Sequence, residues 1–192
     1  MSARPGSAAN ARGSSLIELL IVLAILGTVA GTAALVSPAY LRQVRSDSGL
    51  AQAVEIIRSA RDLSISSRRN IQVRFIGTNA LQTARVEIPG PAVTVLRTLE
   101  LEGRMRFRLV PGLPDTPDRF GNPSAIAFGP TPARLFTSEG TLVNSNGDVL
   151  NGTLFLADPD DRNSARAITI FGATGAMRTW RWDGARWQDA GR

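Results

Sequence analysis

Hydrophobic and polar positions divide the chain into a short leader, an apolar segment, a helical stretch and a region of short strands. Residues 1–13 are mostly small or polar and carry arginine but no acid. Residues 16–36 are predominantly apolar, with Glu18 as their single charge. After Pro38 apolar residues recur at helical spacing, and from Asn70 the period falls towards two. The pattern predicts a long helix followed by a β-rich head.

The apolar segment is long enough to cross a bilayer, because as a helix it would span about 31 Å. Three interpretations remain open. A secretory signal peptide would be cut after small residues such as those at 32–34. A plain membrane anchor would keep the whole segment. In the third, Glu18 is tolerated inside the apolar helix because it pairs with a new α-amino group four residues upstream.

The helical stretch at 39–69 is amphipathic. Its apolar positions, expected to face the head, are Leu50, Ala53, Val54, Ile57, Ala60 and Leu63. Its polar positions, expected to face solvent, are Gln52, Glu55, Ser59, Asp62 and Ser66. Pro38 should bend or break the helix, and residues 46–49 form a second weak point. A cleaved signal peptide would not need this continuation, whereas an anchor that carries a head does.

From Asn70 the chain has the pattern of many short strands separated by turn residues. The expected strands are 71–76, 85–88, 93–101, 105–109, 125–128, 135–137, 141–143, 153–156, 165–171 and 176–182. A Pro- and Gly-rich loop interrupts them at 111–123, and Asn146-Gly147 and Asp183-Gly184 are strong tight-turn dipeptides. Such a region favours an antiparallel sandwich or a partly open barrel. The predicted fold class is α+β, a long N-terminal helix packed against an antiparallel β-sandwich.

The composition is ordinary for a folded protein, but it excludes several kinds of catalytic and metal site. The chain of 192 residues is 43% hydrophobic and 20% charged, which is typical of globular domains. It has no cysteine, which excludes disulfides and thiolate metal sites. It has no histidine, which excludes histidine-based triads and zinc sites. The net charge of +6 is only a weak indication of acidic partners.

Carboxylates occur in two groups that we interpret as surface features. The run Asp158-Pro159-Asp160-Asp161 could offer oxygen ligands to calcium, but its spacing matches no EF-hand loop and fits a solvated turn. Glu100 and Glu102 are expected to form salt bridges along one sheet edge with Arg97, Arg104, Arg106 and Arg108. The sequence has no nucleophile elbow or phosphate loop. We therefore predict that the protein is not an enzyme and binds no metal or other cofactor.

Arginines and tryptophans are interleaved near the C-terminus. The residues concerned are Arg178, Arg181 and Arg186, with Trp180, Trp182 and Trp187. Guanidinium groups on phosphates and indoles stacked on bases would bind nucleic acid. The alternative is a terminal hairpin whose arginines extend over apolar rings. We favour the hairpin, and nucleic acid is the less favoured partner.

The sequence GSSLIELLIVLAIL at 13–26 resembles the class III signal of type IV pilins and type II secretion pseudopilins. The resemblance implies that a prepilin peptidase cuts after Gly13. It further implies that Ser14, at a position where the family usually has phenylalanine, becomes the N-methylated first residue. Glu18 would take part in filament assembly by pairing with the terminus of a neighbouring subunit.

Motifs in the helix and head are similar to those of the GspH/FimT family of minor pilins. ARD at 60–62 and SRRNIQV at 67–73 resemble that family's junction between the helix and the first strand. FTSEGT at 136–141 is similar to its hairpin with phenylalanine and glycine. RAITI at 166–170 and GAMR at 175–178 resemble its final strand pair.

The resemblance implies four segments: a prepilin leader (1–13), a transmembrane half-helix (14–38), an amphipathic half-helix (39–69) and a periplasmic head (70–192). The protein would be a minor pseudopilin of a type II secretion system in the bacterial inner membrane. Its implied partners are other pseudopilins or pilins, the prepilin peptidase, the inner-membrane assembly platform and membrane lipid. One alternative is a FimT-like minor type IV pilin that binds DNA for natural transformation. Another is a periplasmic β domain that is unprocessed or cleaved by signal peptidase.

Overall fold

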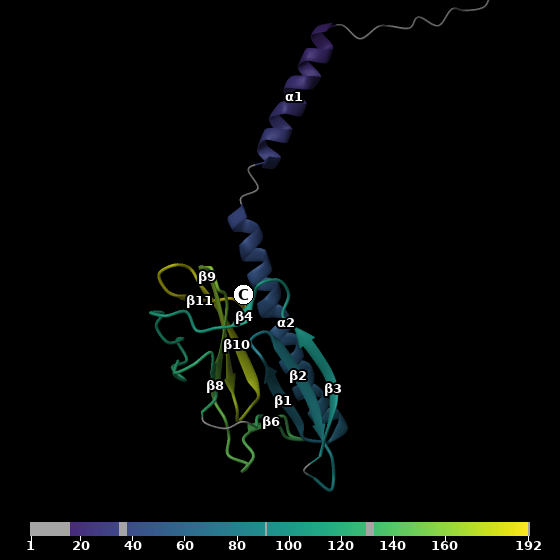
Figure 1. Cartoon of the computed structure of the whole chain (residues 1–192), viewed down its shortest axis with the longest axis vertical. Coiled ribbons are helices and arrows are strands. Elements are labelled where there is room, and N and C mark those ends of the chain that lie inside the picture. Colours follow the sequence, from purple (N-terminus) through teal and green to yellow (C-terminus); the bar gives the residue numbers. More distant parts are fainter. Residues whose placement is uncertain (1–15, 35–37, 91, 130–132, 192) are drawn as a thin grey trace, which may run out of the picture. The chain divides into compact units, whose positions relative to one another are not determined.

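The computed structural model describes residues 16–34, 38–90, 92–129 and 133–191. The chain divides into two compact units, residues 1–41 and 42–192. The first unit holds helix α1 (Leu16–Ala34), and helix α2 (Pro38–Ser67) continues into the second, which holds all the described strands (Figure 1). Within the described ranges, no helix has both the length and the hydropathy required to span a membrane.

Helix α2 begins and ends at residues suited to those positions. Pro38 is its first residue, where a missing N–H costs no hydrogen bond and the fixed φ suits a helix. At the other end, Arg68 takes a left-handed φ of 52°. The amides of Arg68 and Arg69 donate to the carbonyls of Ile65 and Ser64 at 3.3 and 3.2 Å. This pair of bonds is the Schellman motif, which ends many helices.

The predicted weak point at residues 46–49 does not interrupt α2. The Ser46 hydroxyl donates to the Arg42 carbonyl one turn back, at 2.9 Å. Gly49 lies where Met105 packs on the helix, and a Cβ there would stand 2.8 Å from Met105 Cγ. The prediction was wrong because the small residues serve close packing instead of breaking the helix.

Two antiparallel sheets form the head. The first has the order β3-β2-β1-β6-β7, with strands β1 (Ile71–Ile76), β2 (Ala80–Val86), β3 (Val93–Glu100), β6 (Leu135–Phe136) and β7 (Leu142–Val143). The second has the order β11-β10-β9-β8-β4, and β5 also pairs with β8. Its strands are β4 (Arg106–Phe107), β5 (Ile126–Ala127), β8 (Gly152–Asp158), β9 (Asp161–Phe171), β10 (Ala176–Trp182) and β11 (Trp187–Asp189). The α+β prediction, a helix packed on antiparallel sheets, is confirmed.

Strand boundaries follow the predicted ones unevenly. The strands β1 and β10 coincide with the predicted ranges 71–76 and 176–182. The strand β2 starts at Ala80, earlier than predicted, because a tight turn at Gly77 with a φ of 57° folds the chain straight back onto β1. The short strand β11 lies outside every predicted range, since three residues carry too little alternation to be recognised.

The main core lies between α2 and both sheets, and α2 runs alongside β1 and β2 (Figure 1). The buried apolar residues of α2 are Leu50, Ala53, Ile56, Ile57 and Ala60. They pack against β-strand residues of the first sheet, such as Ile71, and of the second, such as Ile168. Leu63 was predicted on this face but is 39% exposed, and Ser64 is buried instead. Ile56 is buried although it was not predicted on this face, and Val54, which was, is only partly buried. The prediction is therefore confirmed for Leu50, Ala53, Ile57 and Ala60.

The second sheet is covered on its other face too. This second apolar cluster consists of Leu113, Phe155, Ala157, Ala165, Ala167, Trp180, Trp182 and Trp187. Strand alternation places Phe155 on this face, while its neighbours Leu154 and Leu156 belong to the main core. Leu113 comes from the Pro- and Gly-rich loop at 111–123. The loop therefore closes a second core over this sheet.

Candidate functional site

Helix α1 presents apolar side chains on every side over residues 16–28, where its side chains are described. Each large hydrophobic side chain from Leu16 to Leu26 is exposed, from 49% at Val22 to 75% at Leu16. A helix without a polar face is stable in lipid or when packed against other apolar helices. This surface is therefore the first candidate for function.

Glu18 is the single ionisable residue in the described part of α1 and lies exposed in its first turn. The amide groups at a helix N-terminus carry partial positive charge, which favours a carboxylate there. In apolar surroundings this effect is small beside the cost of desolvating the charge, so a cationic partner is needed. Gly13 and Ser14, the predicted cleavage and methylation sites, lie outside the described residues.

On α2, Arg61 joins segments that carry the resemblance to minor pilins. Its Nε donates to the Gly140 carbonyl at 3.3 Å and its Nη2 to the Thr174 carbonyl at 3.0 Å. Gly175 has a φ of 65°, and a Cβ on it would overlap both Arg61 Nε and the Gly140 carbonyl oxygen. The helix, the β6–β7 turn and the β9–β10 turn therefore meet closely around one guanidinium. The motifs at 60–62, 136–141 and 175–178 come together as a packing junction.

A second junction joins α2 to the second sheet. Arg166 on β9 has a fully buried side chain, and its Nε donates to Asp47 Oδ1 at 2.8 Å. Its Nη1 donates to the carbonyls of Asn163 and Ala165 at 3.2 and 3.0 Å. Burial lowers the pKa of Arg166, and the hydrogen bond to Asp47 partly offsets that effect. The sequence contains no signal for this pair, because a lone arginine in a strand is expected to face solvent.

The structure separates the three arginines considered for nucleic-acid binding. Arg178 and Arg181 are three residues apart on β10, so they lie on opposite faces of the sheet. Arg178 Nη1 is 2.8 Å from Asp118 Oδ1, and its guanidinium lies 5.2 Å from the Phe171 ring centre. Arg186 lies beyond the strand, in the turn between β10 and β11.

The neighbouring tryptophans are core residues instead of an exposed stacking surface. Trp180, Trp182 and Trp187 are 8%, 5% and 7% exposed. The rings of Trp182 and Trp187 meet edge to face with centres 5.5 Å apart. Trp180 and Trp182 share one face of β10, and the intervening Arg181 lies on the other. This arrangement fits the terminal hairpin that the sequence favoured.

The predicted row of salt bridges around Glu102 is replaced by contacts with other elements. Glu102 accepts hydrogen bonds from the Ser48 hydroxyl and the Gln52 side-chain amide, each at 3.0 Å, so it holds α2. Arg104 pairs instead with Asp158 and Asp160 at the β8–β9 turn. The prediction was wrong because α2 and that turn lie within reach of the segment that follows β3.

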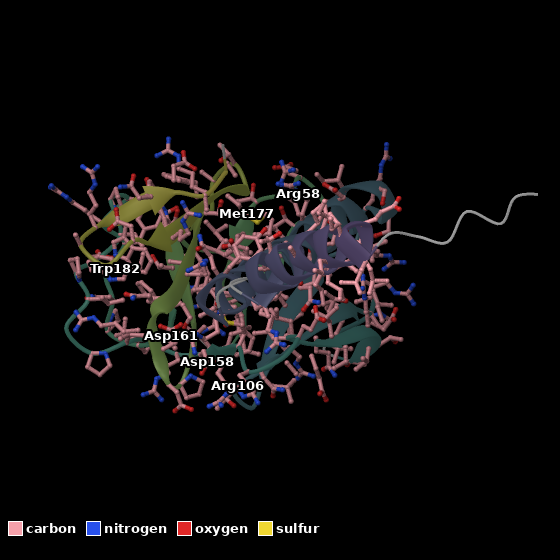
Figure 2. All side chains as sticks on the ribbon, turned by 90° about the horizontal axis from the view of Figure 1, so that it is seen from above. Arg58, Arg106, Asp158, Asp161, Met177 and Trp182 are labelled. Atoms are coloured by element: carbon pink, nitrogen blue, oxygen red, sulfur yellow. The ribbon has the colours of Figure 1, made fainter. Side chains whose placement is uncertain are left out.

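The aspartates at 158–161 form the predicted turn. Asp158 and Asp161, both labelled in Figure 2, are backbone partners in the antiparallel register at the end of β8 and the start of β9. The Asp160 amide donates to Asp158 Oδ1 at 3.0 Å, which is a local turn contact. In the part of the chain that the structure describes, no three or more acidic side chains form a group that could hold a metal ion.

The loop at 111–123 is a structured element that sequence reasoning missed. Asp118 accepts hydrogen bonds from the Thr169 hydroxyl and from Arg178, both on the second sheet. The Trp187 indole donates to the Pro114 carbonyl at 2.9 Å. These partners lie 51 to 73 residues away along the chain. Turn-forming residues in the loop were visible in the sequence, but its distant partners were not.

Comparison with known families gives a match at the N-terminus. The family described as Prokaryotic N-terminal methylation motif matches residues 8–34, which include Glu18 and the whole of α1. The match supports a type IV pilin-like or pseudopilin subunit, processed by a prepilin peptidase and methylated. No curated protein and no solved structure matches the chain.

Proposed function

We propose that the chain is a minor pseudopilin of a type II secretion system, a structural subunit of the periplasmic pseudopilus. The observation that carries the proposal is the methylation motif at 8–34. It coincides with a helix that is apolar on all sides and has Glu18 as the one charge in its described part. The β-rich head packed on α2 is consistent with this role, and we assign no catalytic residue.

In this proposal the prepilin peptidase cleaves after Gly13, and Ser14 becomes the methylated N-terminus. Residues 14–38 hold the subunit in the inner membrane, with the head at 70–192 in the periplasm. Glu18 pairs with the α-ammonium group of a neighbouring subunit inside an apolar interface. Such a pair is far stronger there than at a wet surface, because the local dielectric is low. The inner-membrane platform then adds the subunit to the filament through helix–helix packing.

N-terminal sequencing and intact mass of the protein extracted from its native membrane test the processing step. The expected chain begins at Ser14 and carries one methyl group on its α-amine. A start near Leu35 would indicate signal peptidase, and an intact Met1 would indicate an unprocessed anchor. Either result would overturn the proposal.

Glu18→Ala and Glu18→Gln test the assembly step. Both variants should insert and be cleaved normally, because removing a carboxylate makes membrane insertion easier. Both should lose co-purification with the other pilin-like subunits, because a buried α-ammonium is then left unpaired. The control is Thr28→Ala, which removes a hydroxyl bonded to the Ile25 carbonyl of the same helix and should assemble normally. Normal assembly of both Glu18 variants would show that filament assembly does not depend on the Glu18 carboxylate.

Deletion and complementation distinguish the secretion system from the pilus. Cells that lack the protein should retain in the periplasm the proteins that the secretion system normally exports, and complementation should restore their secretion. Normal secretion with loss of piliation or DNA uptake would instead assign the chain to the alternative, a FimT-like minor type IV pilin.

If the chain is such a DNA-binding pilin, Arg178→Gln, Arg181→Gln and Arg186→Gln should weaken duplex DNA binding. The slope of its salt dependence should fall by about 0.9 for each phosphate that is no longer neutralised.

A further inference from the structure

A cleft lies on the head between the loop at 114–119 and the turn that joins β10 to β11. Its volume is about 540 Å³. Its apolar walls include Pro114, Pro117, Ala185 and Trp187. Two cations, Arg119 and Arg186, line it as well. Mostly apolar walls with a few charged groups are typical of ligand sites of this size.

The loop wall of the cleft is held in a fixed shape. Both Asp115 carboxylate oxygens accept backbone hydrogen bonds at 2.7 Å, one from Thr116 and one from Gly121. Arg119 has a left-handed φ of 57°, which is uncommon for a residue other than glycine. A non-glycine residue keeps that conformation when its surroundings enforce it, and such strain concentrates at functional sites. The wall is therefore formed before any ligand arrives.

The cations of the cleft outnumber its acids, since its charged lining residues are Arg119, Arg186 and one carboxylate, that of Asp115. Asp115 is engaged with backbone amides, and Asp118 with Thr169 and Arg178. Among the described residues, no carboxylate lies within 4.0 Å of the Arg119 guanidinium. Arg186 is 78% exposed, and its Nε is 3.8 Å from Asp183, beyond hydrogen-bond distance. Both guanidinium groups retain donors for an external anion.

The chemistry of the cleft favours a carboxylate ligand on a peptide. Guanidinium groups bind carboxylates through two parallel hydrogen bonds, and the apolar walls suit the methylene groups of glutamate. Single-stranded nucleic acid would need exposed aromatic faces for its bases, whereas Trp187 is 7% exposed. Duplex DNA is held by several phosphate contacts, and this cleft offers two cations. We propose that Arg119 and Arg186 form a docking site for an acidic peptide segment of a partner protein.

Fluorescence anisotropy with a labelled hexaglutamate peptide tests the site. The experiment uses the full chain in a neutral detergent, and it is independent of the pseudopilin proposal. Arg119→Gln and Arg186→Gln should each weaken peptide binding about tenfold, because each removes a charge-assisted bidentate contact. The matched control is Arg97→Gln, which removes the same charge from β3 at the edge of the other sheet and should bind like the wild type.

Three outcomes would overturn the docking site. The first is no binding of hexaglutamate by the wild type. The second is an equal loss of affinity in Arg97→Gln, which would mean that net charge alone attracts the peptide. The third is tighter binding of a labelled 20-base-pair DNA duplex that disappears in the same two cleft variants, which would assign the cleft to nucleic acid.

Discussion

Arg166 on β9 is joined to Asp47 on α2 by a 2.8 Å hydrogen bond between Nε and Oδ1. The Arg166 side chain is fully buried, while that of Asp47 is 44% exposed. Burial lowers the pKa of Arg166 because it disfavours the charged form, and Asp47 acts in the opposite direction. The buried cation therefore depends on α2 staying docked against the second sheet.

Removal of the Asp47 carboxylate should destabilise the head more than loss of an ordinary surface acid. Asp47→Ala should lower the free energy of unfolding by about 2–3 kcal/mol, because the buried Arg166 loses the carboxylate bonded to it and keeps only the longer-range charge of Asp161. Adding Arg166→Met should recover most of that loss, since an apolar side chain needs no partner. Glu55→Ala, at an exposed position of α2, should change stability by less than about 0.5 kcal/mol.

Chemical denaturation of the full chain in neutral detergent measures these differences. Tryptophan fluorescence is a suitable signal, since Trp180, Trp182 and Trp187 all lie in the buried second cluster. A double variant as unstable as Asp47→Ala would show that the aspartate acts through packing instead of charge.

Two glycines with similar backbone conformations should respond differently to alanine. At Gly175 the φ is 65°, and a Cβ would overlap Arg61 Nε and the Gly140 carbonyl oxygen. At Gly77 the φ is 57°, and nothing lies within 4 Å of a Cβ. Gly77→Ala should cost about 1 kcal/mol for the left-handed backbone alone. Gly175→Ala should cost at least about 2 kcal/mol more, because backbone atoms must move. Denaturation experiments measure both variants. An equal loss of unfolding free energy would mean that the atoms around Arg61 move to accommodate the Cβ at little cost.

The local features of the fold could be predicted because they depend on neighbouring residues. Helical spacing identified Leu50, Ala53, Ile57 and Ala60 as the buried face of α2. Alternation identified β1 and β10 with their correct bounds. The assembly candidate, Glu18, was visible because one charge stands out in an apolar run.

Features that depend on distant partners could not be predicted. The pattern around Arg166 is that of a half-exposed strand, and only its contact with Asp47 shows why it is buried. Likewise, the loop at 111–123 is rich in turn residues, yet contacts such as that between Pro114 and Trp187 give it a fixed place. Arg119 became a candidate only when the folded loop placed it in the same cleft as Arg186.

Glycine at the end of α2 should stabilise the protein. Arg68 has a φ of 52° at the position after the last helical residue, where glycine carries no steric penalty. Arg68→Gly should therefore raise the free energy of unfolding by about 1 kcal/mol. Arg69→Gly is the control, since Arg69 does not have a positive φ and should gain nothing. A loss of stability in Arg68→Gly would mean that the arginine side chain contributes more than the strain costs.

Asp183, in the turn after β10, should make stability sensitive to strong acid. Hydrogen bonds lower its pKa from 3.8 to about 2, the largest effect coming from the Gln188 side chain and the next from the amides of Arg186 and Ala185. Because the folded protein holds the deprotonated form, the unfolded chain takes up the proton first as the pH falls. The stabilisation is therefore complete above about pH 4 and is lost progressively towards about pH 2. Asp183→Asn should be less stable than the wild type at neutral pH, and the difference should shrink across that window. Denaturation midpoints of both proteins at matched pH values measure it, and a constant difference down to about pH 2 would contradict the role of the ionised carboxylate.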